Sequence, residues 1–120
     1  LLDRDQEATS IQQQEALDKA SRGPLLLLAV ANYKDSNEDI SKQEKLISLG
    51  CAIQNILLSA YAFGFGSGLS SGRALQSDRI RKLFQLTDDE EPICFITIGT
   101  VLKNKPGRIR PSLSEYHSIF

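Results

Sequence analysis

Residues 41–63 read SKQEKLISLGCAIQNILLSAYAF, and this stretch decides which fold the chain can adopt. It opens with Ser41 and Glu44, the spacing of a capping box, in which each side chain accepts a hydrogen bond from the other residue's backbone NH. No proline interrupts the stretch. Apolar side chains then recur at helical spacing, at Leu46, Leu49, Ile53, Ile56, Leu57, Ala60 and Phe63. We therefore expect one long helix of about 34 Å, at about 1.5 Å per residue.

A second strip on this helix carries small or amide side chains at helical spacing: Ser48, Ala52, Asn55, Ser59 and Ala62. The length of the apolar segment also raises the possibility of a membrane span. Gln54 and Asn55 lie at its centre, however, where an amide is costly in hydrocarbon. A helix that is apolar nearly all round favours the central helix of a soluble protein.

Four glycines and three serines follow within residues 62–74, AFGFGSGLSSGRA. Gly64 is placed to end the helix in the left-handed conformation. The Gly-x-Gly-x-x-Gly fingerprint of dinucleotide sites does not fit, because the spacing fails and the glycines follow a helix instead of opening one. Two interpretations stay open: a tight turn into a strand, or a bare backbone at Leu69–Gly72 that offers its NH groups to a planar ligand.

The other expected elements are shorter. We expect a helix within residues 1–22 with Ser10 as its N-cap and Gly23-Pro24 as its end, and a helix capped at Ser77-Asp78 that runs to about Gln85. In the second helix, Ile80, Leu83 and Phe84 should face inward and Arg79, Arg81 and Lys82 outward. Residues 25–31 form a short apolar run that favours a strand buried on both faces, although its leucines would also suit a helix. Residues 93–99 predict a β-branched strand, residues 88–92 a loop, and residues 103–120 an extended tail.

Composition sets limits on function. At 120 residues the chain suits a single domain, and its net charge of −1 argues against non-specific attraction to nucleic acid or to an anionic membrane. Cys51 and Cys94 each lie in an apolar run, which indicates buried free thiols and a reducing, cytoplasmic compartment. No secretory leader is visible.

Side chains suited to catalysis are few. His117 is the single histidine, near one end and without partners at metal-ligand spacing, so we expect neither a metal site nor a catalytic triad. Glu44 is explained by its capping role. The basic residues of the tail, Lys103, Lys105, Arg108 and Arg110, are either solvated or ligands for a phosphate.

Several segments in order resemble the flavin-dependent nitroreductase family, in particular its compact bacterial branch. They are RGPLLLLAV at residues 22–30, ExxxSxGxAxQNxLLxA at 44–60, GFG at 64–66, SG at 71–72 and IxIGT at 96–100. The resemblance covers the chain from Gln13 to Phe120. It implies an α+β sandwich with a central mixed or antiparallel sheet, built as an intertwined homodimer with FMN in a cleft between subunits.

The resemblance also implies roles for particular residues. Leu69, Ser70, Ser71 and Gly72 would lie against the reactive edge of the flavin ring, and Arg108 or, preferably, Arg110 would bind the FMN phosphate. The strip of small residues on the long helix would let a partner helix come close. The family's N-terminal Arg-Arg-Ser segment has no match here, nor has the flavin-flanking segment that follows it, so the resemblance implies an N-terminally truncated domain.

The function implied is an FMN-dependent oxidoreductase that takes hydride from NAD(P)H and reduces a nitroaromatic, quinone or related acceptor in a ping-pong cycle. The flavin carries this chemistry, so no side chain is required as acid or base. The alternative is a non-catalytic dimeric remnant that lacks a complete flavin site. A third interpretation, a nucleic-acid-binding domain that uses the basic tail, is disfavoured by the net charge.

Overall fold

The computed structural model describes residues 9–21, 23–34, 39–104 and 106–119. Three strands form one sheet in the order β1-β3-β2, with β1 at Leu25–Asn32, β2 at Gly66–Ser70 and β3 at Glu90–Gly99. Both strand pairs are antiparallel. With its helices this sheet gives the expected α+β architecture.

The strand β3 is longer than the sequence predicts. It begins at Glu90, so Glu90, Glu91 and Pro92 belong to the strand and not to a loop. Pro92 lies opposite Val30, beside a shift in the register of β1 against β3. Because proline has no backbone NH to donate, it is tolerated in a strand mainly at such an irregularity.

Helix α2, Lys42–Ala62, is the long helix predicted from the sequence. The capping box is confirmed: Ser41 N donates to Glu44 Oε2 at 2.9 Å, and Glu44 N donates to Ser41 Oγ at 3.2 Å. The end at Gly64 is also confirmed, with φ +80°. Phe65 N donates to Ala60 O and Gly64 N to Tyr61 O, each at 2.9 Å, the two bonds of a Schellman motif.

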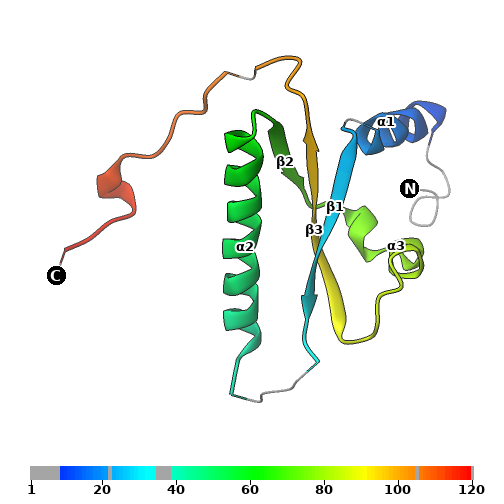
Figure 1. The fold of residues 1–120 in the computed structure, drawn as a ribbon, viewed down its shortest axis with the longest axis horizontal. Coiled ribbons are helices and arrows are strands. Elements are labelled where there is room, and N and C mark those ends of the chain that lie inside the picture. The colour runs from blue at the N-terminus through cyan, green and yellow to red at the C-terminus, as the bar shows by residue number, and fades with distance from the viewer. Residues whose placement is uncertain (1–8, 22, 35–38, 105, 120) are drawn as a thin grey trace.

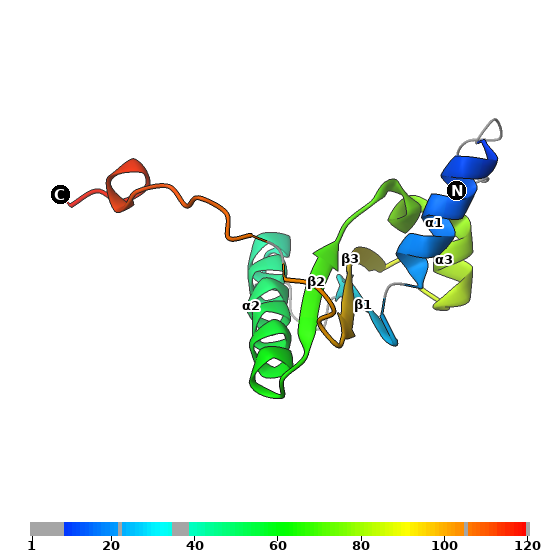
Figure 2. The ribbon, with the colours of Figure 1, turned by 90° about the horizontal axis from the view of Figure 1, so that it is seen from above.

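The helices lie on both sides of the sheet (Figures 1 and 2). Helix α2 runs along one face, and α1, Ser10–Ala20, and α3, Asp78–Leu83, lie on the other side. Apolar side chains of α2, β1 and β3 meet in a small core of Ala29, Ile53, Cys94 and Ile96, with Leu27, Leu49, Leu57 and Ile98 packed against it. Ile96 is 1% exposed, so the centre of β3 is the best-covered point of the fold.

Two N-terminal expectations were wrong in detail. Helix α1 is capped by Thr9, whose hydroxyl accepts from Gln12 N, and not by Ser10. Strand β1 is not buried on both faces, because it is an edge strand of this sheet: Leu25 and Leu26 are 46% and 42% exposed.

Helix α3 begins at the predicted Ser77 cap but ends at Leu83, before Gln85, which has a left-handed φ of 52°. Leu83 is 72% exposed, so the expectation that it faces inward was wrong. Arg81 does not point outward: its guanidinium turns back and donates to the carbonyl oxygens of Thr87 and Glu90. Arg81 therefore ties α3 to the start of β3.

The prediction that both cysteines are buried was correct for Cys94 and wrong for Cys51. Both thiols are free, and Cys94 is buried, whereas Cys51 is exposed on α2. Only Ile53 and Ala60 of α2 are buried, since the helix places a single stripe of side chains on the sheet. Within the described residues, α2 is the one helix long and apolar enough to cross a membrane, a test that core helices of soluble proteins also pass.

The tail is extended, as predicted, apart from a 3₁₀ turn at Leu113–Glu115. This turn has its own capping box, and the hydrogen bonds from Ser112 lower the pKa of Glu115. Every described residue from Val101 to Ile119 is exposed. The tail thus leaves the body beyond α2 (Figure 1).

Candidate functional site

A pocket of about 560 Å³ lies where the last turns of α2 meet the start of β1 and the end of β3. Its walls come from three segments far apart in sequence: Pro24, Leu25, Asn55, Ile56, Ser59, Ala60, Phe63, Phe65, Ile98, Gly99 and Thr100. Gly99 permits the strand and the β1 start to approach, because a Cβ there would lie 2.7 Å from Pro24 Cδ. The volume falls in the range of small-molecule sites.

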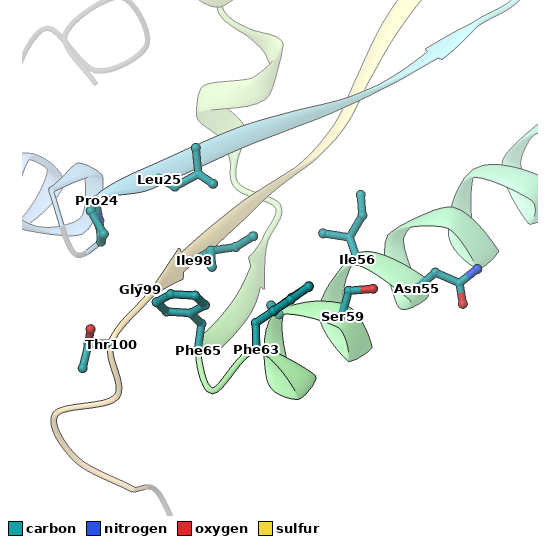
Figure 3. Close-up of a pocket in the computed structure, with 11 residues that line it drawn as sticks. Pro24, Leu25, Asn55, Ile56, Ser59, Phe63, Phe65, Ile98, Gly99 and Thr100 are labelled. Carbon is teal, nitrogen blue, oxygen red and sulfur yellow. The ribbon is translucent and has the colours of Figure 1, made fainter.

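Two aromatic rings stand at one side of this pocket. Phe63 and Phe65 flank Gly64, whose left-handed φ of +80° reverses the chain after α2. The reversal brings both rings to the same hollow, and Figure 3 shows them pointing from the end of α2 toward the strands. Phe63 is 80% and Phe65 48% exposed, so the rings offer uncovered apolar surface.

The polar groups of the pocket are uncharged. They are the amide of Asn55 and the hydroxyls of Ser59 and Thr100, and no Asp, Glu, Lys, Arg or His is among the described residues that line it. Asn55 and Ser59 belong to the strip of small and amide residues that the sequence places on α2. The pocket can therefore hold an apolar molecule and give it a few hydrogen bonds, without a counter-charge.

The loop predicted to approach the flavin lies elsewhere. Leu69 and Ser70 are the last residues of β2, Ser71 and Gly72 follow, and all four are exposed and outside the pocket wall. A Cβ built on Gly68 meets no atom within 4 Å, and one on Gly72 meets only Ala74 N at 4.0 Å. The backbone at the end of β2 is therefore bare, as the second interpretation of the glycines requires.

The predicted phosphate ligands are not near that loop within the single chain. Arg108 and Arg110 are exposed in the extended tail, which passes to the far side of α2 from β2 (Figures 1 and 2). In the single chain, therefore, the two arginines lie apart from Leu69–Gly72.

Other candidate groups have structural roles. The backbone NH and the hydroxyl of Ser41 both donate to the carboxylate of Glu44 and lower its pKa. This carboxylate therefore serves as part of the helix cap. Burial raises the pKa of the Cys94 thiol, which lies in the core. His117 lies in the exposed tail, where its backbone NH donates to the carbonyl oxygen of Leu113. Within the described residues no cluster of three His, Cys, Asp or Glu side chains could hold a metal ion.

Sequence reasoning missed the pocket residues Phe63 and Phe65 as a pair. The available signal was an aromatic residue on each side of a glycine placed to be left-handed, since such a reversal turns both rings to one side. Leu25 and Ile98 could not be assigned in the same way, because their position at a pocket depends on how β1 and β3 pair.

Comparisons with known proteins agree on one family. The sequence model described as the nitroreductase family matches residues 1–100. "Putative NAD(P)H nitroreductase YdjA" of Escherichia coli K12 is 31% identical over 90 residues, which cover 72% of this chain and 49% of that protein. The chain thus spans about half the length of the curated relatives it matches.

Solved structures show the same fold. A nitroreductase-like family protein from Bacillus cereus superposes with a TM-score of 0.75 at 20% identity, covering 94% of this chain and 62% of that one. A variant of the FMN and NADPH-dependent nitroreductase NfnB from Sphingopyxis sp. strain HMH gives 0.72 at 17% identity, covering 91% and 49%. At these identities the likeness concerns the fold alone.

Proposed function

Because this chain belongs to the nitroreductase family, we propose that it is an FMN-dependent NAD(P)H oxidoreductase that reduces nitroaromatic, quinone or related acceptors. The observation that supports this most directly is the bare end of β2. Leu69–Gly72 is exposed, and its neighbours do not fill the space over Gly68 and Gly72. A flat ring needs such a surface, because side chains would hold it away from the backbone NH groups.

In this proposal the chain binds and orients the cofactor. Leu69–Gly72 would lie along the edge of the ring, and Arg108 or, preferably, Arg110 would bind the phosphate, to which a guanidinium group can donate two hydrogen bonds at once. When bound, FMN would supply hydride-transfer chemistry at its N5 position, between NAD(P)H and the acceptor in a ping-pong cycle. In this mechanism no side chain need act as acid or base.

The proposed assembly is a homodimer that covers α2. Large apolar side chains of α2 and its C-terminal cap lie exposed in the single chain, at Leu46, Ile47, Ile56, Leu58, Tyr61 and Phe63. Large apolar side chains left exposed in this number on one helix are typical of a protein interface. A second copy would bury this face, and the resulting dimer would offer a cleft for the flavin between its subunits.

Flavin binding tests the proposal. When FMN is titrated with the purified chain, its fluorescence should be quenched and its visible absorption bands should shift. The absorbance of the bound flavin should then bleach when NADPH or NADH is added without oxygen. Gly72→Val should weaken FMN binding at least about tenfold, since its side chain would occupy the ring's place. Leu102→Ala is the control, because Leu102 is 95% exposed and belongs neither to the loop nor to the two arginines; its affinity for FMN should stay within about twofold.

Protein concentration separates the two functions considered. FMN affinity should rise over the range in which sedimentation shows dimers forming, because the cleft needs both copies. A folded dimer that leaves FMN fluorescence unchanged would contradict the proposal, and the chain would then be the non-catalytic remnant of the fold.

A further inference from the structure

We propose that Leu75 holds the bare loop Leu69–Gly72 in its place and is thereby a positioning residue for the proposed flavin site. The side chain of Leu75 is 4% exposed. It is the only buried one among the described residues between Ala60 and Pro92, the stretch that leads from the end of α2 into β3. The role in flavin binding rests on the proposed function, whereas the anchoring of the loop can be measured without flavin.

The sheet fixes the loop on its N-terminal side. Strand β2 pairs with β3 as far as Ser70, which lies opposite Phe95. Beyond Ser70 this pairing ends, and the side chains of Leu69–Gly72 are exposed, so they contribute little packing of their own. The positions of Ser71 and Gly72 therefore depend on the next fixed point along the chain.

That fixed point is Leu75, in the 3₁₀ turn Arg73–Gln76. The turn lies close to β3 and α3, and Figure 2 shows the chain after β2 turning away from α2 toward α3. The backbone NH of Leu75 donates to the carbonyl oxygen of Gly72 at 3.0 Å, which links the anchor to the last residue of the loop. Only four residues separate Ser70 from Leu75, and so short a segment held at both ends has few conformations.

Leu75 lies outside the main core of the fold, which consists of Ala29, Ile53, Cys94 and Ile96. Further along the chain α3 has its own attachment, because Arg81 donates to the carbonyl oxygens of Thr87 and Glu90. Loss of the Leu75 side chain should therefore release the chain locally, between Ser70 and α3, and leave the sheet folded. A ligand would then have to order the released residues on binding, which lowers its affinity.

Hydrogen exchange and flavin affinity test the two parts of the inference separately. In Leu75→Ala, the backbone amides of residues 71–77 should exchange at least about tenfold faster, while those of β3 change less than about twofold. The affinity for FMN should fall at least about tenfold, because about one further residue of backbone must be ordered on binding. Leu75→Met keeps an apolar side chain of similar volume and should return both values to within about threefold of the wild type.

Ile53→Ala is the matched control. Ile53 is 8% exposed and loses as many carbon atoms, but it belongs to the core between α2 and the sheet. This variant should lower the stability of the whole chain and leave the FMN affinity of the folded protein within about twofold. If circular dichroism shows that either alanine variant loses helix content, Leu75→Val and Ile53→Val repeat the comparison with smaller cavities.

Equal acceleration of exchange in residues 71–77 and in β3 would overturn the inference, since Leu75 would then support the whole fold. Unchanged exchange in residues 71–77 would overturn it as well, because another contact would hold the loop. A wild-type chain that does not bind FMN would contradict the oxidoreductase proposal and the flavin role of Leu75, while the exchange comparison would still decide the anchoring. Wild-type FMN binding that Leu75→Ala leaves unchanged would overturn the positioning role alone.

Discussion

The same substitution at two glycines near one helix should have opposite effects on stability. Gly50 lies inside α2, and a Cβ there meets no atom within 4 Å. Gly50→Ala should therefore stabilise the chain by about 0.5–1 kcal/mol, the difference between glycine and alanine in a helix interior. Gly64 has φ +80°, where an L-residue costs about 1–2 kcal/mol, partly offset by the lower entropy of the unfolded chain.

The two variants should thus differ by about 2 kcal/mol in free energy of unfolding, and by about 8 °C in Tm for a chain of this size. Urea unfolding followed by far-ultraviolet circular dichroism, at a concentration where the chain is monomeric, measures both. A loss of stability for Gly50→Ala under these conditions would refute the reasoning, since it would mean that the space beside Gly50 is filled. A loss that appears only at higher concentration would instead place a second copy against α2.

Three further measurements check the core, the cap and the thiols. Ile96→Ala should cost about 2–5 kcal/mol, because Ile96 is 1% exposed, and Leu102→Ala, at 95% exposed, should change stability by less than about 0.5 kcal/mol. Since the pKa of Glu44 is lowered by folding, its stabilising contribution is present above the ordinary carboxyl pKa and is lost as the pH falls through the folded value. Glu44→Gln keeps the cap without titrating, so urea midpoints at neutral pH and at about pH 3 should differ less in this variant. Cys51 should react with Ellman's reagent in the native monomer and Cys94 only on unfolding, because Cys94 is buried and its pKa is raised; equal rates would contradict this.

Local signals were sufficient for both ends of the long helix. The start of α2 depends on two side chains three residues apart, and its end on a glycine that tolerates positive φ, so both could be predicted from the sequence. Where two local solutions coexist, the sequence cannot choose. Thr9 with Gln12 and Ser10 with Gln13 both have the spacing of a capping box, and the structure uses the first.

Burial could not be predicted in the same way, because it depends on which elements cover which face. The leucines of β1 suggest a strand buried on both faces, but the strand order places β1 at an edge. The run around Cys51 is as apolar as the run around Cys94. Only the second faces both α2 and β1, whereas Cys51 lies on the side of α2 that the sheet does not reach.

The exposed side of α2 and the separation of the residues proposed to bind flavin both favour a second copy of the chain at α2. Helix α2 places one stripe on the sheet, through Leu49, Ile53, Leu57 and Ala60, and leaves its other apolar residues without cover in the single chain. The bare loop at the end of β2 lies on one side of α2 and the basic tail extends on the other. In the single chain the apolar face of α2 is uncovered and the basic tail is exposed, so both are free to contact a partner subunit. A two-fold assembly across α2 would therefore cover the helix and bring further groups to the flavin loop, so cofactor binding and dimer formation should be coupled.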